Sequence, residues 1–262
     1  MSFQGVTEKF MKRRQILSGA GAGLVTTLFT QAAWAQKGGS LSVQWLGHTC
    51  FLFSSGKTRI LVNPFQPIGC TAKYRPPKVQ AGAVLISSQL LDEGAVEGLP
   101  GKPRLIYEPG VYRYNNIQFQ GIATDHDRQG GRRFGTNVVW RWNQGGINIL
   151  HMGGAAAPIT IEQKILMGRP DVLFVPVGGG AKAYNPEEAV QAVRELNPKL
   201  VVPTHYSTQA ADAGKCDLVP VDRFLELMSG TPVRRASSDT ITISSGNLPP
   251  KGMAIQVMSY KF

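Results

Sequence analysis

The stretch LSVQWLGHTCFLFSSGKTRILVNP, residues 41–64, contains three short apolar runs that are separated by residues typical of turns. Each run has the composition of a β-strand, and Gly56-Lys57 supplies a turn between the second and the third. Gly47-His48 separates the first run from the second, and Asn63-Pro64 ends the third run. The folded part of the chain is therefore expected to begin with strands at 41–46, 50–53 and 58–62.

The rest of the chain is rich in strands at first and alternates strands with helices in its second half. The clearest helix start combines Asn185 as N-cap, Pro186 at the first helical position and Glu188 in a capping-box pattern. This order favours one sheet-rich α/β domain with helices outside over two separate domains. Further strands are expected at 83–87, 105–107, 112–114, 117–122, 138–142, 147–151, 172–177, 200–203, 240–244 and 254–259, and helices at 159–167, 186–196 and 222–228.

The composition is that of a globular protein. The 262 residues are 42% hydrophobic and 17% charged, so the chain can bury a sizeable core. A formal charge of +11 would attract phosphates, anionic lipid headgroups or acidic partners, although ordinary solubility explains the same charge. The basic residues do not alternate with aromatic residues and no nucleic-acid-binding motif occurs, so no nucleic-acid partner is expected.

The first 35 residues have the features of a targeting segment. A basic stretch with paired arginines, 11–17, precedes an uncharged stretch of small and apolar residues, 20–33. Ala33-Trp34-Ala35 then forms a cleavage site before Gln36. The pattern predicts a twin-arginine-type signal peptide over 1–35, a mature domain over 36–262 and export to the periplasm or thylakoid lumen. An uncleaved amphipathic anchor is the alternative, but the apolar stretch is too short for a stable transmembrane span.

The three cysteines fall into two groups. Cys50 lies in an apolar run and is expected to be a core thiol. Cys70 and Cys216 lie in loop-like sequence, and an exported protein can hold a disulfide, but spacing alone does not decide whether they pair. The chain contains no C-x-x-C motif, which excludes a zinc knuckle.

The four histidines each follow or end a strand-like run. A single histidine in such a place is most simply structural, but strand ends gather at one edge of a layered fold, where sites form. Four of four at strand ends therefore favour a shared pocket. The residues are His48, His126, His151 and His205.

The order of these motifs resembles the metallo-β-lactamase superfamily, with its ascorbate-phosphate-lactonase-like metal-dependent hydrolases as the most similar branch. The resemblance implies an αββα four-layer sandwich of the α/β class with a two-metal site. The matching landmarks are 47–49, 60–64, 84–87, 124–126, 149–153, 171–179 and 202–206, in the order of that family.

The metal motif of that family is damaged in this chain. Its His-x-His-x-Asp-His motif aligns with Ser88, Leu90, Asp92 and Glu93, and its bridging aspartate aligns with Gly154. The first metal position, which would keep only His126, is expected to be empty, and a dinuclear zinc site is not expected. The second position keeps three oxygen or nitrogen donors, which suit at most one divalent ion such as zinc, manganese or iron. The alternatives are thus no tight metal, or a single weak site formed by Asp92, Glu93 and His205.

The remaining candidates concern acid–base chemistry and anion binding. His126 with Asp125 or Asp127 would form an acid–base pair. The candidate catalytic residues are His126 and, from the damaged metal motif, Asp92. Arginine side chains suit phosphate or carboxylate, and an arginine-rich loop follows His126, although a solvated loop explains the same charges. Ser87 and Ser88 lack the Gly-x-Ser-x-Gly elbow of a nucleophile. The candidate residues for binding an anionic small molecule are His48, Arg128, Arg132, Arg133 and His151.

The signal peptide expected over residues 1–35 predicts export, and the damaged motif predicts a noncatalytic protein that binds an anionic small molecule or a protein partner. Two alternatives remain. One is a mononuclear metal-dependent hydrolase of an ester, lactone or phosphoester, and the other is a structural subunit of an extracytoplasmic assembly. Metal content separates the hydrolase from the other two functions.

Overall fold

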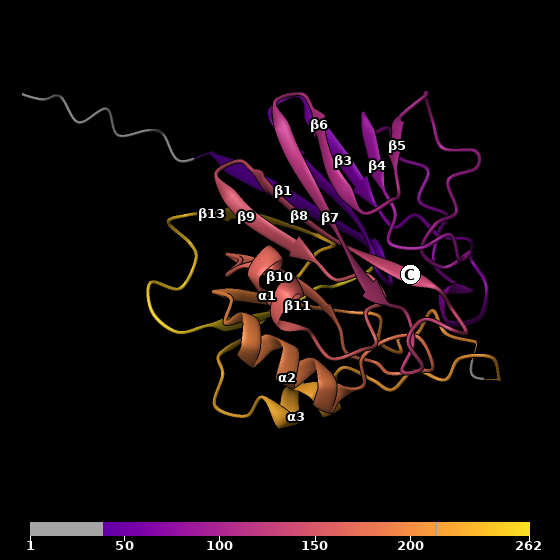
Figure 1. The fold of residues 1–262 in the computed structure, drawn as a ribbon, viewed down its shortest axis with the longest axis vertical. Helices are drawn as coiled ribbons and strands as arrows, with labels where there is room; N and C mark the ends of the chain where they lie inside the picture. Colours follow the sequence, from indigo (N-terminus) through magenta and orange to yellow (C-terminus); the bar gives the residue numbers. More distant parts are fainter. Residues whose placement is uncertain (1–38, 213) are drawn as a thin grey trace, which may run out of the picture. The chain divides into compact units, whose positions relative to one another are not determined.

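The computed structural model describes residues 39–212 and 214–262, in which two β-sheets pack face to face (Figure 1). The predicted signal peptide, residues 1–35, lies outside the described residues. The first sheet has the strand order β13-β1-β2-β3-β4-β5. Its strands are β1 (Ser40–Gly47), β2 (Cys50–Ser55), β3 (Thr58–Val62), β4 (Ala83–Leu85), β5 (Arg104–Ile106) and β13 (Thr240–Ser244).

The second sheet has the strand order β12-β14-β11-β10-β9-β8-β7-β6. Strands β9, β10, β11, β14 and β12 run parallel to one another, and β6 to β9 are antiparallel neighbours. The bounds are β6 (Gly110–Tyr114), β7 (Ile117–Asp125), β8 (Thr136–Gln144), β9 (Ile147–His151), β10 (Val172–Pro176), β11 (Leu200–Thr204), β12 (Val233–Arg235) and β14 (Ala254–Val257).

In the described part of the chain, three α-helices lie on the side of the eight-stranded sheet (Figure 1). They are α1 (Ile161–Met167), α2 (Pro186–Leu196) and α3 (Asp222–Leu227). Helix α2 begins as predicted, because the side chain of Asn185 accepts a hydrogen bond from the backbone N–H of Glu188. Within the described part of the chain, no helix is long and apolar enough to cross a membrane.

Aromatic side chains fill the space between the two sheets. The rings of Phe51 and Phe174 lie 4.8 Å apart, and those of Phe53 and Trp142 lie 5.0 Å apart in edge-to-face geometry. Phe51 and Phe53 belong to β2 in the first sheet, whereas Phe174 and Trp142 belong to the second. This shared core holds the sheets in a fixed relation and so fixes the positions of the loops at their ends. The predicted fold class is confirmed.

The predicted elements differ from the observed ones mainly at their ends. The helix expected over 159–167 begins at Ile161, because Thr160 acts as its N-cap. The short strand β12 was not predicted, because all three of its residues are exposed and its sequence has no apolar alternation. A 3-10 turn, η1 (Gly69–Thr71), interrupts the proline-rich loop that follows β3.

The cysteines that the sequence left unassigned form a disulfide between Cys70 and Cys216, which are 146 residues apart. The bond joins η1 to the loop that precedes α3. Cys50 is a buried free thiol in β2, which confirms the prediction of a core thiol, and burial raises the pKa of this thiol well above its usual value.

Candidate metal site

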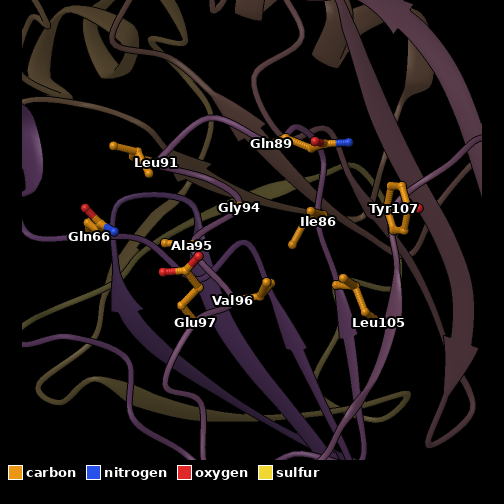
Figure 2. Close-up of a pocket in the computed structure, with 10 residues that line it drawn as sticks. All are labelled: Gln66, Ile86, Gln89, Leu91, Gly94, Ala95, Val96, Glu97, Leu105 and Tyr107. Atoms are coloured by element: carbon orange, nitrogen blue, oxygen red, sulfur yellow. The ribbon is translucent and has the colours of Figure 1, made fainter.

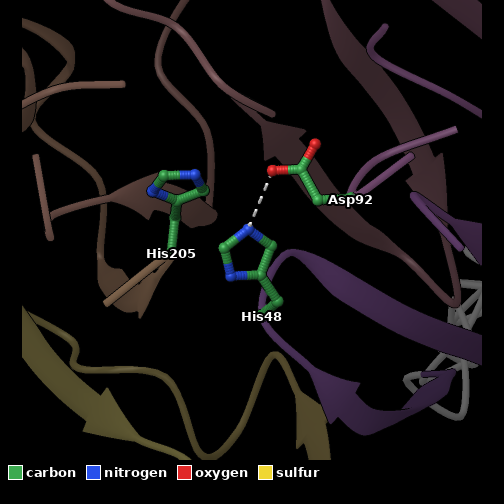
Figure 3. A group of neighbouring side chains, drawn as sticks. All are labelled: His48, Asp92 and His205. Carbon is green, nitrogen blue, oxygen red and sulfur yellow. Dashed lines mark ion pairs between the residues drawn. The ribbon is translucent and has the colours of Figure 1, made fainter. Parts of the chain in front are cut away.

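Three predicted site residues from distant parts of the chain meet at one edge of the sheets (Figure 3). His48 follows β1, Asp92 lies in the loop after β4, and His205 follows β11. One ligand atom from each of these residues lies within 4.8 Å of the others. The rings of His48 and His205 have centroids 4.3 Å apart, and Nε2 of His48 lies 3.7 Å from Oδ2 of Asp92. The geometry is that of a small group of metal-ligating atoms.

The two histidines of this group have left-handed backbone conformations, with φ of 54° at His48 and 51° at His205. Such a conformation costs about 1–3 kcal/mol for a residue other than glycine, so the surrounding structure must impose it. The indole N–H of Trp45 donates to the carbonyl of His48, and the backbone N–H of Gly178 donates to the carbonyl of His205. A Cβ at Gly178 would overlap this same carbonyl oxygen. Both strand ends are thus held in sharp turns that aim the imidazoles into the site.

Several ring nitrogens of the site are buried without a partner. Within residues 39–212 and 214–262, Nε2 of His48 and both ring nitrogens of His205 have no hydrogen bond. A buried polar atom left in this state costs about 1–3 kcal/mol. Burial and the nearby His48 lower the pKa of His205 to about 3, so its imidazole is neutral and can offer a lone pair. Two imidazoles and one carboxylate fit a divalent zinc, manganese or iron ion that keeps an open position for a further ligand.

Asp92 is ionised in this environment. Burial alone would raise the pKa of its carboxyl group, but the nearby imidazole of His48 and the charge of Lys182 lower that pKa well below its usual range. Lys182 donates to Oδ2 of Asp92, and its side chain is 20% exposed. The carboxylate therefore already has a cationic neighbour inside the site.

A pocket of about 190 Å³ opens onto the three ligand residues. Its wall contains positive, negative and apolar groups, so it can accept a polar molecule beside the ligand atoms. The lining residues are His48, Cys70, Asp92, Arg133, Phe134, Gly180, Ala181, Lys182, His205, Asp217 and Leu218.

A larger cavity of about 370 Å³ is lined in part by the loop that carries Asp92 (Figure 2). It shares that loop through Gln89 and Leu91, and Ile86, Val96 and Leu105 give it an apolar wall. None of the histidines lines this cavity. Among the described residues, the metal-ligating side chains therefore line the smaller pocket and not this cavity.

Glu93 and His126 form a second buried pair, with Oε1 of Glu93 3.7 Å from Nε2 of His126. Both side chains are fully buried. Burial raises the pKa of Glu93, but the charges of His126 and Lys182 outweigh it and hold that pKa below its usual range. A Cβ at Gly154 would lie 2.6 Å from Oε1 of Glu93 and closer still to the ring of His126. The absence of a side chain at Gly154, which aligns with the bridging aspartate of the family, leaves room for this pair.

The set of ligand residues expected from the sequence needs one correction. The structure places His48 with Asp92 and His205, whereas the expected set contained Glu93 and assigned His48 to ligand binding. The reason is local, because adjacent side chains in the turn at 90–93 point in different directions. Asp92 faces His48 and Lys182, and Glu93 faces His126.

His151 is a core residue and does not reach the pocket, which corrects its assignment to ligand binding. Its Nε2 lies 3.0 Å from the carbonyl oxygen of Thr49, and its Nδ1 accepts a hydrogen bond from the backbone N–H of Gly153. The ring stacks on Phe174 at a centroid distance of 5.6 Å. Burial lowers the pKa of His151 to about 4, so it is neutral and has both nitrogens satisfied.

Of the three candidate arginines, only Arg133 lines the pocket, where its guanidinium lies 4.8 Å from the ring centre of Phe134. Arg132 is exposed on the same loop. Arg128 is engaged elsewhere, because it pairs with Glu188 and donates to two carbonyl oxygens of the loop at 180–183. The expected binding role of Arg128 is therefore replaced by a structural one.

The expected acid–base pairs between His126 and its neighbours do not form. Asp125 is exposed on β7 while His126 is buried, because successive residues of a strand face opposite sides. Asp127 accepts hydrogen bonds from four backbone N–H groups in its own loop. The carboxylate that His126 meets is Glu93, which belongs to a different part of the chain.

Lys182 is the residue of this site that the sequence analysis missed. A lysine after a run of glycines has no motif of its own, and the triple glycine at 178–180 was the only local signal. Its contact with Asp92 joins residues 90 positions apart.

Two facing sheets with a group of metal-ligating residues at the strand ends define the metallo-β-lactamase class of folds. The chain belongs to the β-lactamase superfamily, because the model of the β-lactamase superfamily domain matches residues 42–205. It is 24% identical over 196 residues to a UPF0173 metal-dependent hydrolase of Thermoplasma acidophilum, covering 64% of this chain and 84% of that protein. A UPF0173 metal-dependent hydrolase of Methanoculleus marisnigri is 28% identical over 188 residues, covering 64% and 82%.

The solved structures agree with this assignment. A proposed Zn-dependent hydrolase of the metallo-β-lactamase superfamily from Thermotoga maritima superposes with a TM-score of 0.65 at 29% identity, covering 83% of this chain and 98% of that one. The relatives are named metal-dependent hydrolases, and this overturns the prediction of a noncatalytic binding protein. That prediction weighted the missing motif residues and overlooked the contribution of His48. The predicted export stays a prediction, since residues 1–35 lie outside the described part of the chain.

Proposed function

We propose that this protein is a mononuclear metal-dependent hydrolase that acts on an ester, lactone or phosphoester with an anionic group. The observation that carries the proposal is the convergence of His48, Asp92 and His205 within 4.8 Å, with unpartnered buried ring nitrogens. The names of the relatives support hydrolysis, and the superfamily assignment supports the position of the site. Zinc, manganese and iron are all compatible with this donor set.

The residues in and beside the pocket would have three roles: metal binding, substrate orientation and proton transfer. His48, Asp92 and His205 would hold the ion, which when bound supplies Lewis-acid chemistry and lowers the pKa of water. Arg133 and Lys182 place positive charge on the pocket wall, where they can orient a carboxylate or phosphate of the substrate. Glu93 and His126 form a buried pair that can hold a proton near the reacting groups.

The test combines metal content with hydrolysis. Protein purified without chelator is expected to contain close to one equivalent of a transition metal and to hydrolyse members of a panel of small lactones and phosphodiesters. Asp92→Asn and His205→Ala should lose both metal and activity. Asp171→Asn is the matched control, because Asp171 also pairs with a lysine, Lys199, but does not line the pocket. A metal content below about a tenth of an equivalent that Asp92→Asn leaves unchanged would refute the proposal.

The location of the protein stays a proposal as well. Disulfides persist in oxidising compartments and are rare in the cytosol, so the Cys70–Cys216 bond supports the periplasm or thylakoid lumen. The paired arginines at 13–14 in the sequence support the same location. Fractionation of cells, followed by labelling of free thiols, tests this location. Only Cys50 should be unoxidised in the protein, and a cytosolic pool with three free thiols would contradict it.

A further inference from the structure

Lys182 and a bound metal ion would use the same carboxylate, that of Asp92. The ammonium group of Lys182 donates to Oδ2 of Asp92, and this oxygen also lies 3.7 Å from Nε2 of His48. Since one ligand atom from each of the three ligand residues lies within 4.8 Å of the others, the carboxylate that Lys182 contacts is also one that an ion would use. The lysine is thus a positive charge built into the candidate metal site.

Arg128 and two glycines hold the loop that carries Lys182, whereas the Lys182 ammonium group makes its contact with Asp92. Gly179 and Gly180 have φ of 81° and 79°, which the L side chains of other residues rarely adopt. Arg128 donates to the carbonyl oxygens of Gly180 and Ala183, on both sides of Lys182. Arg128 is itself anchored by Glu188 in the first turn of α2. The position of the ammonium group can therefore change by rotation of the flexible lysine stem, without movement of the loop.

The electrostatics favour replacement of the Lys182 ammonium group by the metal ion at Asp92 over binding of both cations together. The side chains of Lys182 and Asp92 are 20% and 21% exposed, so water screens their charges only in part. A divalent ion and an ammonium group on one carboxylate group would repel each other strongly at such separations. The neighbouring Glu93 is already paired with His126 and gives the displaced ammonium group no free carboxylate. The open pocket, which Lys182 and the carboxylate-bearing Asp217 also line, is the space left to it.

We propose that Lys182 is a resident counter-ion of Asp92 that competes with the metal, lowers the metal affinity of the site and turns into the pocket when the metal binds. The inference rests on the proposed metal site and adds a means of regulating its loading. It also connects loading to substrate binding, because the displaced ammonium group becomes available to an anionic group of the substrate. Metal-free protein would then lack both the ion and this binding group.

The experiment is a titration of chelator-stripped full-length protein with zinc and with manganese, in competition with a chromophoric chelator. Lys182→Met keeps the length of the side chain and removes its charge, and it should bind metal about tenfold more tightly or better. Lys182→Arg keeps the charge and should remain within about threefold of the wild type. Lys199→Met is the matched control, since Lys199 pairs with Asp171 away from the pocket, and it should leave the affinity unchanged.

The possible results separate this inference from the proposed function. Equal or weaker metal binding by Lys182→Met, in a protein whose binding still depends on Asp92, overturns the role of Lys182 alone. No metal binding by either the wild type or Lys182→Met overturns the metal site and this inference together. Lys182→Gln serves as a second uncharged variant, and the melting temperature of each variant verifies that it is folded.

Discussion

Removal of the Cys70–Cys216 disulfide should destabilise the protein strongly. The bond closes a loop over a sequence separation of 146 residues. In the chain-entropy model, closing a loop of this length lowers the entropy of the unfolded chain and so stabilises the folded state by about 5 kcal/mol at 25 °C. For a domain of this size, that free energy corresponds to a fall in Tm of roughly 10–20 °C.

The folded state should otherwise change little. The segments that the disulfide joins also share backbone hydrogen bonds, from Asp212 to Gly69 and from Lys73 to Ala210. The double variant Cys70→Ala/Cys216→Ala should therefore keep the wild-type circular dichroism spectrum. Because Cys70 lines the candidate metal pocket, the variant should also bind metal less tightly than the oxidised wild type.

The assay is urea unfolding of the wild type and the double variant, with and without a reductant. Reduction should bring the free energy of unfolding of the wild type to that of the variant and leave the variant unchanged. Equal unfolding midpoints for the oxidised wild type and the variant would refute the reasoning, since the loop closure would then contribute nothing measurable.

Three further changes test the packing around the site. Gly154→Ala should lower the free energy of unfolding by about 1–3 kcal/mol, because its methyl group would overlap the ring of His126, and unchanged urea unfolding would contradict this. Asp127→Asn should lower Tm at pH 7. Burial raises the pKa of Asp127, but four backbone N–H groups lower it further, from 3.8 to about 2. The difference in Tm between the wild type and Asp127→Asn should therefore fade as the pH falls from 4 to 2. A difference in Tm that does not depend on pH would contradict this. Arg128→Met should increase amide hydrogen exchange at 180–183, and equal protection would show that its bonds to this loop and to Glu188 do not hold the loop.

Local structure in this protein follows from residues that are close together in the sequence. Asn185 and Pro186 start α2 because a capping side chain and a preset φ act within one turn. Asn115 and Asn116 both have positive φ, as a tight hairpin turn requires, and connect β6 with β7. The ordered landmarks from 47 to 206 predicted the fold through their resemblance to the metallo-β-lactamase superfamily.

The composition of the site was decided by contacts between residues far apart. Asp92 and Glu93 are neighbours in sequence and share a charge, yet one faces His48 and Lys182 and the other faces His126. Side-chain direction in a turn depends on backbone angles that tertiary packing imposes, and no local pattern specifies them.

The sequence by itself determined the fold class, the approximate strands and helices, and the candidates at the strand ends. Only the tertiary structure decided that His48 joins Asp92 and His205, that Lys182 lies against Asp92, and that Cys70 pairs with Cys216. The physical reason is that propensity and patterning act over a few residues, whereas a site forms where the packing of two sheets brings distant loops together.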